Sequence, residues 1–158
     1  MSEVLHGNFK DVRARHRNPH KDYEYIKRDL IPHVAGKCQF THYEILPGKS
    51  AYPYHYHLDS EEVYFILSGK GVVRTPGGEI ELSAGDFLHF PAGKEGAHKL
   101  TNTSENENLI YLDFDIKPNP DICFYPDSNK VGIWGKGDDG LNKLYIADQN
   151  VDYFEGES

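Results

Sequence analysis

Two histidines separated by one residue are the clearest candidates for chemistry in this sequence. His55 and His57 flank Tyr56 in a stretch typical of a β-strand. Because the side chains of a strand alternate between its two faces, both imidazoles are expected to point the same way. Imidazoles grouped on one face are candidate ligands for a divalent transition metal. An isolated pair of this kind is more often a partly exposed surface feature, so the interpretation depends on what lies nearby.

Glu62 and His98 are the residues that would complete a metal site. Glu62 lies five residues after His57, which is the wrong parity for one continuous strand. Residues 58–60 must therefore turn, and a hairpin would place the carboxylate beside the pair. His98 follows a tight turn at residues 91–93 and lies in the next predicted strand. This makes His98 a plausible fourth ligand, although spacing alone does not bring it to the other three.

Short apolar and aromatic runs, separated by Gly, Pro and Asn, surround these candidates. Between residues 37 and 116 the runs recur at the spacing of strands in an all-β sandwich or barrel. The predicted strands are 38–46, 51–57, 62–67, 71–75, 79–82, 86–90, 97–102 and 108–116. Further strands are predicted at 23–26, 122–125 and 131–134.

A single domain is expected for the 158 residues, since a chain of this size can bury about 70% of its unfolded surface. No repeat or linker divides it. We expect an N-terminal arm over residues 1–36, a β-barrel core over 37–116, and a C-terminal extension over 117–158 packed on the same domain. The basic residues of the arm, among them Arg13, Arg15 and Arg17, are expected to be solvated.

Composition argues against several classes of protein. The formal net charge is −8 and no basic stripe interleaves with aromatic residues, which makes nucleic acid a poor candidate partner. No apolar run reaches the ~20 residues of a membrane helix, and no signal-peptide pattern opens the chain, so we expect a cytoplasmic protein outside the membrane. Cys38 and Cys123 lack CxxC spacing and are expected to be reduced thiols.

Ten residues in two groups resemble the two signature motifs of the cupin superfamily. The first motif is matched by Gly48, His55, His57, Glu62 and Gly69, and the second by Gly85, Pro91, Gly93, His98 and Asn102. The gap between them, residues 70–84, is near the minimum for the family, as in compact prokaryotic cupins. Glu62 is preferred to Glu61, because neighbours on a strand face opposite ways and Glu62 has the family's distance to Gly69.

The resemblance implies an all-β double-stranded β-helix, or jelly-roll, barrel with a metal site in its mouth. The implied ligands are His55, His57, Glu62 and His98. Three imidazoles and a carboxylate suit one divalent transition metal ion, Fe, Mn, Zn, Ni, Co or Cu, and leave positions open for a substrate. The resemblance also implies a homodimer, for which the N-terminal arm or residues 121–134 could supply an edge strand.

The expected function is a metal-dependent enzyme acting on a small polar molecule. Residues 125–132 and 152–157 resemble a group of short, functionally uncharacterised cupins, some of which carry a sugar-phosphate isomerase label. An isomerase and a dioxygenase are both compatible with the site. The alternative is a non-catalytic module that binds a sugar or another small molecule. A sugar-phosphate isomerase would need a cationic clamp, for which the candidates are Lys49, Arg74, Lys94 and Lys99.

Strand parity also suggests which residues line the cavity. Tyr64 and Ile66 share the parity of Glu62 and should line the same cavity, with Tyr64 the better pocket candidate. Ordinary core packing is the expected role of Tyr54, Phe87 and Tyr111. Asp113 and Asp115 share one strand face and are expected at a solvated edge.

Overall fold

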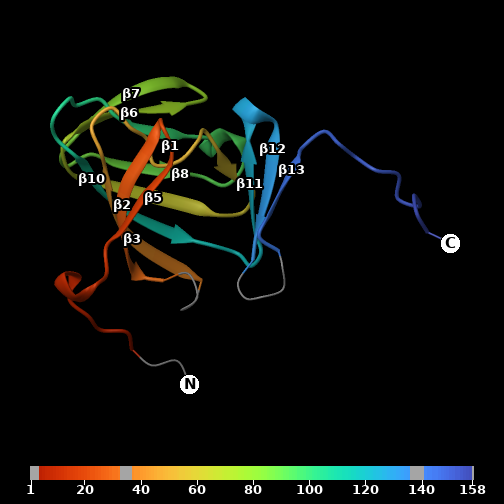
Figure 1. The fold of residues 1–158 in the computed structure, drawn as a ribbon, viewed down its shortest axis with the longest axis horizontal. Helices are drawn as coiled ribbons and strands as arrows, with labels where there is room; N and C mark the ends of the chain where they lie inside the picture. Colours follow the sequence, from red (N-terminus) through yellow and green to blue (C-terminus); the bar gives the residue numbers. More distant parts are fainter. Residues whose placement is uncertain (1–3, 33–36, 136–140, 158) are drawn as a thin grey trace.

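The computed structural model describes residues 4–32, 37–135 and 141–157, and antiparallel strands dominate it (Figure 1). The strands are β1 Arg15–His20, β2 Tyr23–Ile31, β3 Cys38–Ile45, β4 Tyr56–His57, β5 Glu61–Ser68, β6 Lys70–Thr75, β7 Gly78–Ser83, β8 Phe87–Phe90, β9 Lys99–Asn102, β10 Leu109–Ile116, β11 Asp121–Tyr125, β12 Lys130–Trp134 and β13 Lys143–Ile146. Single 3-10 turns are η1 Phe9–Asp11, η3 Lys94–Gly96 and η4 Pro126–Ser128. The predicted all-β class is confirmed.

The strands of the described residues form three antiparallel sheets. The largest has six strands in the order β1-β2-β3-β10-β5-β8, and a second has the order β7-β6-β9. The third, β13-β12-β11-β4, joins the C-terminal strands to the short histidine-bearing strand. Figure 1 shows β11, β12 and β13 beside the barrel strands, with the last residues extending away from them.

The predicted strand at 51–57 is the largest departure from the sequence prediction, because only Tyr56–His57 forms β4. Pro53 has no backbone N–H and cannot complete a ladder there. His55 instead makes an isolated antiparallel bridge with His98. The other predicted strands in the barrel differ from the observed ones only near their ends.

The N-terminal residues extend the large sheet. Strand β2 pairs along most of its length with β3, and β1 pairs with β2. The side chains of β1 are exposed, as expected for Arg15 and Arg17, and Arg15 forms an ion pair with Asp29. Residues 23–26, predicted as a strand, form the start of β2, whose residues are half-buried or buried.

Alternate residues of β10 point into the barrel and define its core. Leu109, Tyr111, Asp113 and Asp115 are all buried, and Asp115 has no exposed surface. The predicted solvated edge at the two aspartates is therefore wrong. Strand β10 is central in the sheet, paired with β3 on one side and β5 on the other, so neither of its edges meets water.

Two further predictions need revision. Phe87, expected in the core, is 74% exposed. Strands β11 and β12, suggested as pairing edges for a dimer, already have partners on both sides, whereas β1 has a single partner among the described strands.

No helix in the described ranges is long and apolar enough to cross a membrane.

Candidate metal centre

Backbone hydrogen bonds bring the two motif histidines His55 and His98 side by side. The His55 N–H donates to the carbonyl of His98 at 3.1 Å, and the His98 N–H donates back at 2.8 Å. Residues bridged in this way project their side chains together, and the two ring centroids lie 4.7 Å apart. The structure thus brings His98 to the site, which sequence spacing alone could not do.

A glycine-dependent turn precedes His98. Gly93 has a φ of 86°, which favours glycine. A Cβ placed on Gly96 would lie only 1.9 Å from the carbonyl oxygen of Pro91. The close packing of this turn therefore requires glycine at position 96, and the turn leads to His98, which directly precedes β9.

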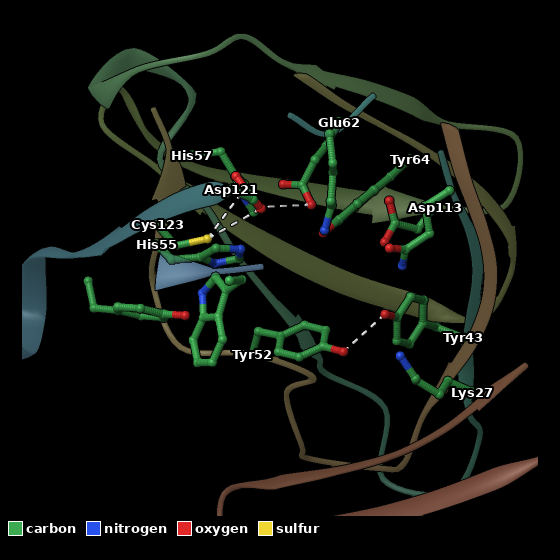
Figure 2. Close-up of a pocket in the computed structure, with 14 residues that line it drawn as sticks. Lys27, Tyr43, Tyr52, His55, His57, Glu62, Tyr64, Asp113, Asp121 and Cys123 are labelled. Carbon is green, nitrogen blue, oxygen red and sulfur yellow. Dashed lines mark hydrogen bonds and ion pairs between the residues drawn. The ribbon is translucent and has the colours of Figure 1, made fainter. Parts of the chain in front are cut away.

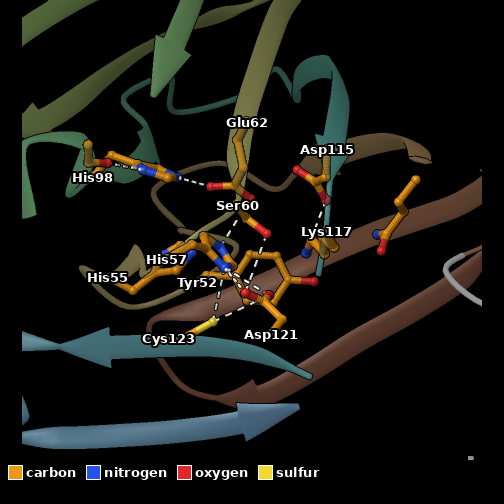
Figure 3. Close-up of polar contacts among 12 residues, drawn as sticks. Tyr52, His55, His57, Ser60, Glu62, His98, Asp115, Lys117, Asp121 and Cys123 are labelled. Atoms are coloured by element: carbon orange, nitrogen blue, oxygen red, sulfur yellow. Dashed lines mark hydrogen bonds and ion pairs between the residues drawn. The ribbon is translucent and has the colours of Figure 1, made fainter. Parts of the chain in front are cut away.

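Glu62 lies between two of the imidazoles (Figure 3). Its Oε1 is 3.4 Å from Nε2 of His57, and its Oε2 is 3.2 Å from Nε2 of His98. Glu62 is buried, whereas Glu61 is exposed and pairs with His89 at 2.9 Å. The carboxylate that points into the barrel is therefore that of Glu62.

Backbone carbonyls fix the orientation of two imidazole rings. His55 Nδ1 is 2.9 Å from the carbonyl oxygen of Pro53, and His98 Nδ1 is 2.9 Å from that of Gly96. Because a carbonyl oxygen only accepts, each Nδ1 must carry the proton and donate it. In the neutral rings the Nε2 lone pairs are left to face the cavity.

The third imidazole, that of His57, is held by acidic and sulfur groups. Asp121 Oδ2 accepts from His57 Nδ1 at 2.9 Å, and Cys123 Sγ lies 3.1 Å from the same nitrogen. Ser60 Oγ donates to Asp121 Oδ1 at 3.4 Å. Sequence analysis did not predict this role for Asp121 or Cys123, because the role depends on the pairing of β11 with the distant β4.

Burial and neighbouring charges shift the pKa values of these groups in different directions. Burial, reinforced by His98, lowers the pKa of His55 to about 3. Burial also lowers the pKa of His57, but Glu62 and Asp121 outweigh it and the net pKa is raised. Burial raises the pKa of Glu62, yet His57 and His98 bring it well below its usual range. Glu62 is therefore an ionised carboxylate among imidazoles.

The unpartnered atoms of the site fit a metal ion. Nε2 of His57 and Oε2 of Glu62 are buried and have no hydrogen-bond partner within the described part of the chain. Candidate ligand atoms of His55, Glu62 and His98 all lie within 4.8 Å of one another. Ligands bound at about 2.1 Å to one ion lie roughly 3 to 4.2 Å apart. His55, Glu62 and His98 can therefore hold one divalent ion with little movement, while His57 lies outside this group and faces it through Glu62.

The donor set at the centre is nitrogen and oxygen, because Cys123 lies on the other side of His57, at Nδ1. Burial raises the pKa of the Cys123 thiol, which keeps it protonated. Both Cys123 and Cys38 are free, as predicted. Three imidazoles and a carboxylate suit a borderline divalent transition metal rather than a closed thiolate site.

Three of the candidate ligands, His55, His57 and Glu62, line a cavity of about 300 Å³ (Figure 2). This volume is at the lower end for small-molecule sites. Tyr64 lines the cavity as predicted, and its hydroxyl donates to Nε2 of His98 at 3.2 Å. Ile66, expected beside it, is instead fully buried in the apolar core.

The cationic residues of the cavity are not those that the sequence suggested. Arg74 pairs with Asp127 at the surface, the Lys49 ammonium donates to a backbone carbonyl, and Lys99 lies over a tyrosine ring. Neither these residues nor Lys94 line the cavity, whereas Lys27 and Lys117 do. Lys117 shares its parity with the inward residues of β10, which is a signal that sequence analysis could have used.

Comparison with known proteins places the fold and the motifs in one family. Residues 41–115 match the family described as Cupin domain. An uncharacterised protein of Methanocaldococcus jannaschii is 32% identical over 83 residues, which cover 52% of this chain and 65% of that protein. Quercetin 2,3-dioxygenase of Bacillus subtilis is 41% identical over 46 residues, 29% of this chain and 14% of the enzyme. Less than two thirds of either relative is thus matched.

Two solved structures resemble the whole chain more completely. A proposed sugar phosphate isomerase of Acidithiobacillus ferrooxidans has a TM-score of 0.74 and 24% identity, with 90% of each chain covered. A sugar phosphate isomerase of Silicibacter pomeroyi has a TM-score of 0.75 and 17% identity, covering 89% of this chain and 92% of its own. At these identities the similarity shows the fold. Residues 41–115 are thus similar to the Cupin domain family, and the predicted jelly-roll barrel is confirmed.

Proposed function

We propose that this protein is a metal-dependent isomerase of a small hydroxy-carbonyl compound such as a sugar phosphate. The observation that carries the proposal is the set His55, His57, Glu62 and His98 beside a polar cavity, in which Nε2 of His57 and Oε2 of Glu62 have no hydrogen-bond partner among the described residues. Similarity to two cupins named as sugar phosphate isomerases supports it.

The four residues would hold one divalent ion, which supplies a Lewis acid able to polarise a carbonyl or hydroxyl oxygen. The protein keeps the three rings in place through their Nδ1 hydrogen bonds to Pro53, Gly96 and Asp121. Such outer hydrogen bonds fix ring orientation before any ion arrives.

Two proton-bearing groups would serve the substrate's oxygens. Burial and the charge of Glu62 raise the pKa of Tyr64, so its hydroxyl stays protonated. Burial, Asp115 and Glu62 raise the pKa of Asp113, which also lines the cavity. Isomerisation of a hydroxy-carbonyl compound exchanges a carbonyl for a hydroxyl on adjacent carbons, so a group that gives and takes protons at oxygen is required. Tyr64 and Asp113 are the candidates for that role.

A dioxygenase is the second candidate, and one observation favours it. The segment similar to quercetin 2,3-dioxygenase is the most nearly identical among the curated relatives compared above. The same nitrogen and oxygen ligands suit an ion that binds dioxygen. The alternative of a non-catalytic binding module would be favoured by ligand binding that a metal ion leaves unchanged.

Isotope exchange separates these functions. Protein loaded with each divalent metal would be incubated with aldose and ketose phosphates in D2O without oxygen, and carbon-bound deuterium followed by NMR. We expect deuterium to enter the carbon next to the carbonyl as the isomers interconvert, and chelation to abolish it. No exchange with any metal, together with oxygen uptake in air, would replace the isomerase by the dioxygenase.

A further inference from the structure

Two lysines face the cavity apart from the candidate ligands. Lys27 and Lys117 line the same cavity as His55 and Glu62, and Figure 2 shows Lys27 on the opposite side from His55, with Tyr52 between them. Neither lysine belongs to the cupin motifs or has a role in the metal centre.

The two lysines reach the cavity from separate parts of the chain. Lys27 lies on β2 opposite Tyr43 of β3. Lys117 directly follows β10, in the alternation of inward residues that includes Asp113 and Asp115. The N-terminal hairpin and the end of the barrel's central strand therefore each contribute one ammonium group.

Each ammonium retains hydrogen-bonding capacity for a ligand. Lys27 Nζ is 3.2 Å from Oδ1 of Asp29, and Lys117 Nζ is 3.0 Å from Oδ2 of Asp115. Asp29 is also paired with Arg15. An ammonium carries three N–H donors, so these ion pairs hold the two lysines in place without using all of their donors.

Both basic and acidic groups surround Lys27. The pKa of Lys27 is lowered to about 8. Burial is the largest cause, the charges of Arg15, Lys117 and Arg17 act in the same direction, and Asp113 opposes them. Two ammonium groups that line one cavity can bind an anion together, even in a chain whose net charge is −8.

We propose that Lys27 and Lys117 bind the anionic group of the substrate, a phosphate or a carboxylate, while its carbonyl or hydroxyl end lies toward the candidate metal ligands. This inference rests on the proposed function, which assigns the carbonyl or hydroxyl end of the substrate to the candidate metal ligands. It adds the substrate class for the same site, a compound with an anionic group. It makes the N-terminal hairpin part of the binding site.

Anion binding can be measured through the fluorescence of Trp134, the single tryptophan of the chain, because this residue lines the cavity. Its fluorescence would be followed while metal-free protein is titrated with inorganic phosphate and, separately, with acetate. We expect saturable binding, with phosphate tighter for a phosphorylated substrate and acetate tighter for a carboxylate. Lys27→Met is expected to weaken binding by at least about tenfold, and Lys49→Gln, which removes a lysine outside the cavity, is expected to leave it unchanged.

Lys117 needs a second variant, because Lys117→Gln leaves Asp115 buried without its cation. The double variant Asp115→Asn/Lys117→Gln removes both charges, and a thermal melt verifies that it folds. Weaker phosphate binding in this variant as well would support the pair. Phosphate and acetate affinities unchanged in both the Lys27 and the double variant, or no anion binding by the wild-type protein, would overturn the inference.

Metal content measured on the same samples separates this inference from the proposed function. Lysine variants that keep their metal but lose anion binding would support the anion site. Anion binding that depends on the lysines in a protein that takes up no metal would leave this inference standing and remove the metalloenzyme.

Discussion

The two nitrogens of His57 have different roles, and this division explains how the candidate metal centre is built. Nδ1 is bound to Asp121, whereas Nε2 faces Glu62 and has no hydrogen-bond partner among the described residues. The Asp121 carboxylate at Nδ1 therefore sets the orientation of the ring, and with it the position of Nε2, the nitrogen that would bind a metal ion.

Asp121→Asn tests this outer contact. The amide oxygen can still accept the hydrogen bond, but the negative charge that makes His57 a better ligand is lost. We expect the affinity for a divalent metal to fall by about 10- to 100-fold, measured by competition with a chromogenic chelator. Asp127→Asn, which alters a surface ion pair with Arg74, is the matched control. Equal affinities for all three proteins would contradict the role of Asp121.

Asp113→Asn tests the buried carboxyl pair in metal-free protein. The pKa of Asp113 is raised by burial and by Asp115, so the folded protein holds a proton that the unfolded chain loses above pH about 4. The folded state then binds more protons, and stability falls as pH rises. We expect the variant to melt at a higher temperature than wild type at neutral pH, with a difference that shrinks toward acid. A lower melting temperature at every pH would refute this account.

Lys27 gives the anion site a pH dependence. Its pKa of about 8 means that the ammonium is lost as pH rises through that value, while Arg15, Arg17 and Lys117 stay charged. Asp29 and Asp113 face the same group. We expect phosphate binding, followed by Trp134 fluorescence, to weaken above pH about 8 in the wild type, and Lys27→Met to lose this step. The same step in both proteins would assign it to another group.

At the scale of the elements, strand alternation predicted much of the site. It placed Glu62 and Tyr64 inward, and the outward direction of Glu61 follows from the same rule. The alternation also grouped Asp113 with Asp115, but it could not tell that their strand would be central, because that depends on pairing with β3 and β5. The turn residues near β4 did not predict its partner strand, because that partner is β11, which lies far along the chain.

The turn before His98 supplies a prediction at this scale. Gly96→Ala would place a methyl group against the carbonyl of Pro91, so the turn must shift. We expect a loss of about 1 to 3 kcal/mol in the free energy of unfolding by urea, together with weaker metal binding. Gly77→Ala is the control, because its new Cβ would meet only the Thr75 hydroxyl at an ordinary 3.7 Å. Equal losses in both variants would show that the close contact is unimportant.

At the scale of the whole molecule, the fold brings charged groups of both signs into one cavity, and the net charge of the chain does not predict this grouping. A chain with a net charge of −8 encloses imidazoles, two lysines and several carboxyl groups in one cavity. The motifs indicated similarity to the Cupin domain family and the four candidate ligands from sequence. The other half of the cavity comes from β2 and from residues after β10, outside the motifs, and only the assembled barrel brings these parts together.

Metal content tests the central claim most directly. Elemental mass spectrometry would be applied to untagged protein purified without chelator, to the His55→Ala/His98→Ala variant, and to His89→Ala, which removes an exposed histidine outside the cavity. We expect close to one equivalent of a divalent transition metal in the wild type and His89→Ala, and loss of that metal in the double variant. Wild-type protein that holds no metal, even after reconstitution with each candidate ion, would contradict the claim.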